Sequence, residues 1–219
     1  MSLSSHDQSL LHRLQATSWQ AGWLLPPPLP ENGAAGITVK VGGSLLTRRD
    51  WPQLLGGLLN ASNAPLQIIV GGGRVVDGLR QLDAASPQPA ERMHRLAIAA
   101  MTVTALMVAE ELGLPVHREP TAAASHRHGV ILPETWQARG GFAGLPASWE
   151  VTSDSLAAIV AATVGQPLLL VKSVRPPHDC EPPPMSKLAE AGWVDPYFPR
   201  VADRLSGLAW AAPPAALKA

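Results

Sequence analysis

The chain has 219 residues, of which 46% are hydrophobic and 16% charged, and its 17 basic and 17 acidic side chains leave no formal net charge. This length can bury a substantial core in one large or two small domains, and the charge balance gives no electrostatic reason to expect nucleic acid or membranes as partners. The single cysteine cannot form an internal disulfide and no apolar stretch reaches the length of a membrane span, so we expect a cytoplasmic protein.

The N-terminal residues are predicted to form an appendage. Residues 1–23 indicate a short amphipathic helix whose apolar face consists of Leu10, Leu11, Leu14 and Trp19. The prolines of residues 26–30 form a stiff polyproline spacer. We therefore expect an N-terminal appendage and linker over residues 1–35, loosely docked or disordered, and a main domain over residues 36–219.

From residue 36 onward, apolar runs of strand length alternate with segments of helical periodicity. The predicted strands cover residues 37–41, 66–70, 115–118, 129–132 and 167–173. The predicted helices cover residues 73–84, 90–112, 154–164 and 50–61, the last of these with Asp50 as its N-cap. Strands that alternate with helices indicate an α/β fold with a mostly parallel sheet covered on both faces.

The helix predicted over residues 90–112 is almost entirely apolar. Little polar surface remains between Met93 and Met107, so this helix is either buried inside the fold or part of a subunit interface. We expect a homo-oligomer, in the simplest case a dimer.

Glycines directly follow two of the predicted strands. The first turn is Gly42-Gly43-Ser44 and the second is Gly71-Gly72-Gly73. Bare backbone between a strand and a helix presents N–H groups to an anion, and Ser44 adds a hydroxyl donor or a helix cap. Neither turn has the spacing of a Rossmann or Walker A loop, and each alone is also compatible with an ordinary strand-to-helix connection. Together they predict two arms of one phosphate-binding site.

Two of the four lysines in the chain, Lys40 and Lys172, lie beside predicted strands. A lysine ammonium suits a phosphoryl group that moves during a reaction. Ser153 and Asp154 lie where the helix 154–164 begins, and they are either ordinary capping residues or part of a site. In the second case Asp154 holds both lysines through charge-assisted hydrogen bonds, which requires the three side chains to meet at the C-terminal edge of a parallel sheet.

These segments occur in an order that resembles the motifs of the amino acid kinase family. The matching segments are Val39–Ser44, Val70–Gly73, Ser153–Ala157 and Leu168–Val174, and the resemblance covers about residues 36–175. It implies a three-layer α/β/α sandwich and an ATP-dependent kinase that transfers the γ-phosphoryl group to a phosphate or carboxylate of a small molecule. It also implies ATP and Mg²⁺ as cofactors, with the metal held mainly by the nucleotide phosphates.

Carried over to this chain, the resemblance assigns catalytic roles to three residues. Lys40 would neutralise the transferred phosphoryl group, Lys172 would contact ATP phosphates, and Asp154 would orient both lysines. The two glycine turns, with Ser44 and Ser153, would bind the acceptor and the γ-phosphate.

Within the family, the chain is most similar to a compact branch associated with methanofuran biosynthesis. The shared pattern runs through Gly71–Asp77, Arg80 and His94–Met101. The acceptor of that branch is (5-(aminomethyl)furan-3-yl)methyl phosphate. Arg80 would bind the acceptor phosphate, or it would simply form a helical pair with Asp77.

The residues after Lys172 depart from the family pattern. Most relatives continue with Asp-Gly and a nucleotide-binding loop, whereas this chain has Arg-Pro-Pro-His-Asp-Cys at residues 175–180. Prolines remove backbone donors, so adenine recognition is altered or lost, and the alternative function is a catalytically silent relative that binds a nucleotide or an oxyanion. Residues 126–128, His-Arg-His, have no Cys, Asp or Glu at ligand spacing, and we predict no metal site made of protein side chains.

Overall fold

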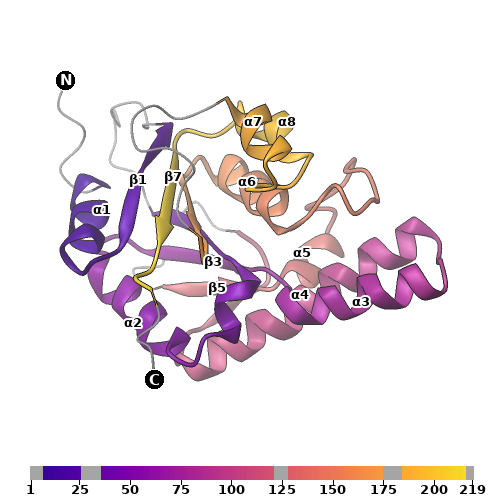
Figure 1. Cartoon of the computed structure of the whole chain (residues 1–219), viewed down its shortest axis with the longest axis horizontal. Coiled ribbons are helices and arrows are strands. Elements are labelled where there is room, and N and C mark those ends of the chain that lie inside the picture. The colour runs from indigo at the N-terminus through magenta and orange to yellow at the C-terminus, as the bar shows by residue number, and fades with distance from the viewer. Residues whose placement is uncertain (1–6, 26–35, 121–127, 175–183, 216–219) are drawn as a thin grey trace.

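The computed structural model describes residues 7–25, 36–120, 128–174 and 184–215 (Figure 1). In this part of the chain a seven-stranded sheet, in the order β1-β7-β6-β2-β3-β5-β4, forms the middle layer. Neighbouring strands are parallel, apart from the antiparallel pair of β1 with β7. The strands are Gln20–Leu25 (β1), Ile37–Val41 (β2), Leu66–Val70 (β3), Val116–His117 (β4), Gly129–Ile131 (β5), Leu168–Val171 (β6) and Leu208–Ala212 (β7).

Helices cover both faces of this sheet, which confirms the predicted three-layer α/β/α fold. One face packs against α1 (Asp7–Ala16) and α2 (Trp51–Ala61). The other face packs against a group of four helices: α5 (Pro133–Gln137), α6 (Ser153–Val164), α7 (Met185–Glu190) and α8 (Phe198–Ala202). A short 3₁₀ helix, Gly43–Thr47, follows β2, while α3 (Gly73–Ala85) and α4 (Ala90–Glu111) lie side by side as an arm at one edge of the molecule (Figure 1).

Strand alternation decides which side chains of β2 and β6 face α6. Successive side chains of a strand point to opposite faces, and Val39 and Val41 pack on the α1–α2 side. Lys40, between them, therefore points to the α6 face. Leu168 and Leu170 of β6 pack on that same face, so Lys172, two residues further, continues on it.

The N-terminal segment differs from the single helix predicted for it. The helix α1 ends at Ala16, and β1 pairs antiparallel with β7 at the edge of the sheet. Neither strand was predicted, because strand pairing between segments so far apart in sequence leaves no local periodic signal. The predicted apolar face is buried, with Leu14 fully so. Residues 26–30 lie outside the described residues, and the division of the chain at residue 36 stays a prediction.

Two helices on the arm depart from expectation. By length and composition alone, α4 could cross a membrane, contrary to the expectation that no stretch is long enough. It packs on β3 and β5 and contributes Ile98 and Ala105 to the two halves of the core, as a core helix does. In contrast, no residue of α3 is buried, and Leu82 is 67% exposed.

The predicted cap of α2 is also different. Asp50 precedes the helix, but its side chain makes no capping hydrogen bond. Its carboxylate instead pairs with the Arg48 guanidinium at 2.7 Å. The charged neighbour two residues away therefore competes successfully with the helix N–H groups for this carboxylate.

Candidate active site

Lys40, Asp154 and Lys172 meet on the α6 face, at the C-terminal edge of the sheet. Lys40 Nζ lies 2.8 Å from Asp154 Oδ1, and Lys172 Nζ lies 2.7 Å from Asp154 Oδ2. One carboxylate therefore bridges two ammonium groups, with one oxygen for each. Lys40 and Asp154 are each only 5% exposed. The meeting of the three side chains follows from strand alternation and from the position of Asp154 in the first turn of α6.

The cluster carries two cations and one anion. Burial and the neighbouring Lys40 lower the pKa of Lys172 to about 8, although Asp154 opposes both effects. Burial would raise the pKa of Asp154, but the attraction of Lys40 and Lys172 outweighs it and holds that pKa below its ordinary value. At neutral pH the cluster is therefore positively charged, in a partly desolvated place where a further anion would be attracted strongly.

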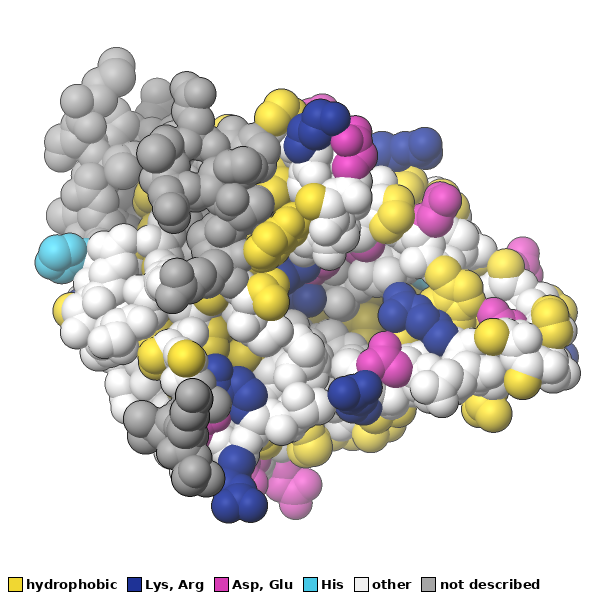
Figure 2. All heavy atoms as spheres, in the orientation of Figure 1, with side chains coloured by type: hydrophobic (Ala, Val, Ile, Leu, Met, Phe, Trp, Pro, Cys, Tyr) yellow, Lys and Arg dark blue, Asp and Glu magenta, His cyan; other side chains and the backbone are white. Residues whose placement is uncertain are grey.

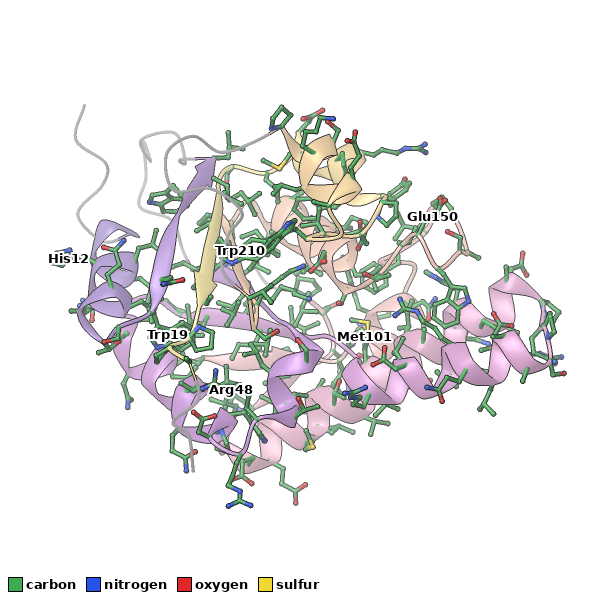
Figure 3. All side chains as sticks on the ribbon, viewed as in Figure 1. His12, Trp19, Arg48, Met101, Glu150 and Trp210 are labelled. Carbon is green, nitrogen blue, oxygen red and sulfur yellow. The ribbon has the colours of Figure 1, made fainter. Side chains whose placement is uncertain are left out.

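The ammonium of Lys172 contacts two tryptophans, one through its backbone oxygen and the other through its ring. Lys172 Nζ donates a hydrogen bond to the backbone oxygen of Trp193 and lies 5.3 Å from the ring centre of Trp210. Trp210, labelled in Figure 3, points from β7 toward the helices on the α6 face. Neither contact could be predicted from local sequence, because both residues are far from Lys172 along the chain.

The two glycine turns are pressed against each other. A Cβ atom on Gly43 would lie 2.2 Å from the backbone nitrogen of Gly73, which has a φ of +49°. A side chain at Gly43 would therefore push the turns apart, and the requirement for glycine there comes from packing. A Cβ atom on Gly71 would lie 2.9 Å from Ser153 Oγ, so the start of α6 lies directly against the second turn.

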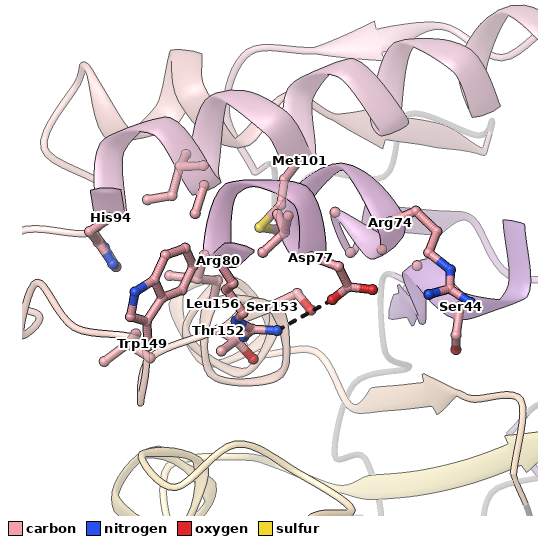
Figure 4. Close-up of a pocket in the computed structure, with 18 of the residues that line it drawn as sticks. Ser44, Arg74, Asp77, Arg80, His94, Met101, Trp149, Thr152, Ser153 and Leu156 are labelled. Carbon is pink, nitrogen blue, oxygen red and sulfur yellow. Dashed lines mark ion pairs between the residues drawn. The ribbon is translucent and has the colours of Figure 1, made fainter. Parts of the chain in front are cut away.

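A cavity of about 290 Å³ opens beside these turns (Figure 4). The starts of both α3 and α6 reach it, and a helix N-terminus favours an anion. The rest of its lining includes three charged residues, Arg74, Asp77 and Arg80. It also includes two ring side chains and several apolar ones: His94, Trp149, Val76, Ala97, Ile98, Met101, Val151 and Leu156.

The predicted site residues divide between the cavity and the cluster. The cavity is lined by Gly43, Ser44, Gly71, Gly72, Gly73, Arg80 and Ser153. Gly42, Lys40, Asp154 and Lys172 are not among its lining residues, and Ser153, next to Asp154, connects the two groups. Gly42 instead donates its N–H to the Val171 oxygen at 2.8 Å, which ties the end of β2 to β6. Ser44 Oγ lies 3.0 Å from Ser173 Oγ across the same two strand ends.

Arg80 forms the predicted helical pair and also lines the cavity, while its binding of an acceptor phosphate stays a prediction. Its guanidinium lies 3.6 Å from Asp77 Oδ1, as a helical pair, and it also faces the cavity. It lies 5.0 Å from the ring centre of Trp149, whose Nε1 donates to Asp83 Oδ2 at 2.8 Å. Trp149 is therefore fixed as a wall of the cavity by two contacts with α3.

His94, which the sequence analysis cited only as part of a pattern, also lines the cavity. Burial lowers its pKa, although a hydrogen bond with the backbone of Ser148 opposes the shift. The imidazole is therefore biased toward its neutral form, in which it offers one donor and one acceptor.

Two segments named in the sequence concern the binding of nucleotide or metal: residues 175–180 and residues 126–128. Residues 175–180, with the altered nucleotide loop, lie outside the described residues, as do His126 and Arg127. His128 Nδ1 accepts a hydrogen bond from the Leu66 N–H at 3.2 Å, which is a structural role. Among the residues that the structure describes, no group of three or more His, Cys, Asp or Glu side chains could hold a metal ion.

Together the sheet, its helical layers and the cluster define a three-layer α/β/α protein with a buried, positively charged group at the C-terminal edge of its parallel strands. This is the fold of the amino acid kinase family. No protein-family model and no curated protein matches the chain.

The solved structures to which the chain is similar include one uridylate kinase and two UMP kinases. The uridylate kinase of Archaeoglobus fulgidus has a TM-score of 0.53 and 13% identity, over 79% of this chain and 89% of that one. The UMP kinase of Ureaplasma parvum has a TM-score of 0.45 and 16% identity, over 63% and 68% of the two chains. That of Bacillus anthracis has a TM-score of 0.47 and 14% identity, over 64% and 65%. At these identities the Archaeoglobus likeness establishes the fold alone.

Proposed function

We propose that the chain is an ATP-dependent, cytoplasmic small-molecule kinase that transfers the γ-phosphoryl group to a phosphate or carboxylate acceptor. The observation that carries this proposal is the Lys40–Asp154–Lys172 cluster, with one carboxylate oxygen 2.8 Å from one lysine and the other 2.7 Å from the second. A buried charge is costly unless it is used or paired, and here the cations outnumber the anion. Phosphoryl transfer needs mainly position and positive charge, and both are present.

Each group has a role in that reaction. Lys40 neutralises the charge of the moving phosphoryl group, Lys172 holds donor phosphates, and Asp154 keeps the two ammonium groups apart and aligned. Mg²⁺, when bound, would neutralise part of the charge of the nucleotide phosphates, which would be its main ligands. A phosphate acceptor already has a nucleophilic oxygen at neutral pH, so the chain requires no general base.

The cavity supports a small acceptor with three chemical parts. The glycine turns and the start of α3 suit a phosphate, and the wall of Ile98 and Met101 suits a small unsaturated ring. Asp77 supplies a carboxylate for a cationic group. We propose (5-(aminomethyl)furan-3-yl)methyl phosphate as the acceptor, because its phosphate, furan and ammonium match these three parts.

The transfer itself is tested with γ-labelled ATP, Mg²⁺ and this acceptor. We expect label in the acceptor, and a decrease of about 100- to 1,000-fold in kcat/KM for Lys40→Met, because one charge that stabilises the transition state is lost. Lys187→Met is the matched control, since Lys187 is an exposed lysine that pairs with Glu190. Equal rates in the two variants would remove the role of Lys40.

The acceptor is tested by removing one chemical part at a time. Asp77→Ala is expected to raise KM for the aminomethyl compound and to leave KM for (furan-3-yl)methyl phosphate unchanged. UMP is the comparison acceptor, since uridylate kinases share the fold. Faster transfer to UMP than to the furan phosphate would overturn the proposed acceptor while leaving the kinase proposal in place.

The contacts of Lys172 support the alternative function, a catalytically silent protein that binds a nucleotide or an oxyanion. Its ammonium already donates to Asp154 and to a backbone oxygen, so it is less free to follow a moving phosphoryl group than Lys40. Calorimetry with Mg–ATP, carried out beside the transfer assay, separates the two functions. Binding without transfer to any acceptor favours the silent protein.

We also propose that the protein is a homodimer, formed through the α4 stripe, which we define as Leu96, Ala99, Val103, Leu106 and Met107. Four of these residues are large and apolar, and Val103 is 57% exposed. Figure 2 shows hydrophobic side chains along the edge of the arm formed by α3 and α4. A contiguous apolar surface of this kind marks an interaction site more often than a free surface.

The sequence of the stripe suits a second copy of the same chain. In an antiparallel pair of α4 helices centred on Val103, Ala99 faces Met107 of the partner subunit, so that a small side chain meets a large one. At the ends, Arg95 faces Glu111 of the partner subunit, and both of these residues are exposed. Two-fold symmetry repeats each of these contacts, which makes the surface self-complementary.

A further inference from the structure

Asp195 lies outside any helix or strand, yet its buried carboxylate accepts five hydrogen bonds. Its Oδ2 accepts from the Thr152 N–H at 3.1 Å, from Thr152 Oγ at 2.9 Å and from the Ser155 N–H at 2.9 Å. Its Oδ1 accepts from Ser155 Oγ and from the Phe198 N–H. The loop containing Asp195 is therefore tied to the start of α6, about 40 residues earlier in the chain.

These bonds replace the usual local cap of α6. Thr152 is the N-cap residue of the helix, but its side chain makes no capping bond of its own. A carboxylate at a helix N-terminus is favourable, and here it comes from a distant segment. The two clamped residues, Thr152 and Ser155, directly flank Ser153 and Asp154.

The same loop contacts the other side of the cluster. Trp193, two residues before Asp195, accepts a hydrogen bond from Lys172 Nζ through its backbone oxygen. The Trp193 ring packs edge-on against Trp210 at 5.6 Å, and Trp210 in turn lies beside the Lys172 ammonium. Residues 193–195 thus contact Lys172 directly and hold the first turn of α6, which contains Asp154.

We propose that Asp195 is a positioning residue for the Lys40–Asp154–Lys172 cluster: it fixes the first turn of α6 so that each oxygen of Asp154 reaches one lysine. A helix cap alone would stabilise α6 without affecting Lys172. The kinetic part of the inference rests on the proposed kinase function, whereas the geometric part does not.

Charge gives the proposal a second, independent consequence. Within the described part of the chain, Lys40, Asp154 and Asp195 are the charged groups that act on Lys172, and Asp195 raises the pKa of that lysine. Loss of its charge should therefore lower the pKa of Lys172 further. If Asp154 also turns away, the loss of its attraction adds to the decrease.

The test compares Asp195→Asn with Asp203→Asn, the same change at an exposed residue of the same segment. In NMR spectra, lysine labelled with ¹³C at Cε gives few signals, because the chain has four lysines. The signal that is missing from the spectrum of Lys172→Met is that of Lys172. We expect Lys172 to titrate below its wild-type pKa of about 8 in Asp195→Asn and at the wild-type pKa in Asp203→Asn. With ATP and the acceptor, kcat should decrease about 10- to 100-fold in Asp195→Asn while KM for the acceptor stays within about twofold.

The outcomes are distinct. If Asp195→Asn only lowers the melting temperature and leaves the Lys172 titration unchanged, Asp195 is a helix cap and the inference is wrong. If even the wild-type protein transfers no phosphate, the proposed function fails, and the Lys172 titration in Ser155→Ala, which keeps the Asp195 charge, still decides whether the bonds of Asp195 position the cluster. Should Asp195→Asn not fold, Ser155→Ala, which removes one hydroxyl donor, is expected to shift the titration in the same direction by less. An unchanged titration in that variant would also contradict the inference.

Discussion

The helices α4 and α6 are both apolar, but the molecule uses them in opposite ways. In α6, eight consecutive residues from Asp154 to Ala161 are buried, including a carboxylate and a hydroxyl. In α4, which is 22 residues long, also eight residues are buried, and large apolar side chains remain on the surface. Composition alone does not separate the two helices. Polar groups are usually exposed and large apolar ones buried, and each helix departs from this at one place. The buried carboxylate of α6 belongs to the candidate site, and the exposed apolar residues of α4 form the proposed interface.

The largest expected effect is the loss of stability when Asp154, the buried carboxylate of α6, is replaced. Asp154→Ala leaves Lys40 and Lys172 buried without their shared partner, and we expect the free energy of unfolding to decrease by about 3–5 kcal/mol. Urea unfolding measures it. Asp77→Ala is the control, because the Asp77–Arg80 pair is half exposed and should be worth less than about 1 kcal/mol. Similar losses in the two variants would contradict the contrast between a buried and an exposed ion pair.

The second effect concerns the exposed apolar residues of α4. Val103→Glu puts two like charges together at the centre of the proposed two-fold axis, so we expect the dimer to dissociate, with the dissociation constant raised at least about tenfold. Analytical ultracentrifugation over a range of concentrations measures it. Val174→Glu makes the same change at a valine of similar exposure, 50%, outside the arm, and should leave the dimer intact. A wild-type protein that stays monomeric at high concentration would remove the proposed interface.

The third effect is a pH dependence that belongs to the α6 side. The pKa of Lys172 is about 8, so raising the pH through 8 removes the excess positive charge of the cluster. Calorimetry with Mg–ATP should show weaker binding above this pH, and Lys172→Met should not show the step.

The same pKa fixes the sign of one contribution to stability. The unfolded chain keeps the Lys172 proton up to a pKa near 10.5, so between pH 8 and 10.5 the unfolded state binds more protons than the folded state. The contribution of Lys172 to the free energy of unfolding therefore rises with pH in that window and is lost as the pH falls through 8. The free energy of unfolding of the wild-type protein minus that of Lys172→Met measures this contribution. If this difference decreased between pH 8 and 10.5, it would contradict the buried position of the ammonium.

The smallest expected effect is a gain in stability from adding a methyl group to the exposed surface of α3. A Cβ atom on Gly78 of α3 would meet nothing within 4 Å, so Gly78→Ala should raise the free energy of unfolding by less than about 1 kcal/mol. Thermal unfolding of Gly78→Ala and of the opposite change in α6, Ala158→Gly, measures both effects. Ala158 is fully buried, and its loss should destabilise by more than the gain at Gly78.

Much of the parallel core could be predicted because it is encoded locally. The strands β2, β3 and β6 are short β-branched and leucine runs, of which β2 and β3 end where predicted and β6 ends at Val171, two residues earlier than predicted. Strand alternation then brings Lys40 and Lys172 to one face. The meeting with Asp154 could be anticipated because a helix following this kind of sheet begins at its C-terminal edge.

The remainder depends on contacts between distant segments. The pairing of β1 with β7 joins the two ends of the chain, and neither strand has a distinct periodic signal. Asp195 looks like an ordinary loop residue in the sequence, since the donors it satisfies are about 40 positions away. The helix α3 could be predicted from its periodicity, but periodicity reports an apolar side and not whether other residues cover it, and Val75 and Leu82 are exposed.

A crystal structure with Mg²⁺ and a non-hydrolysable ATP analogue tests the central claim most directly. The proposed kinase predicts the terminal phosphate beside the two glycine turns, about 3 Å from Lys40 Nζ, with the other phosphates toward Lys172. An analogue bound with its terminal phosphate away from Lys40 and from both turns would contradict the account.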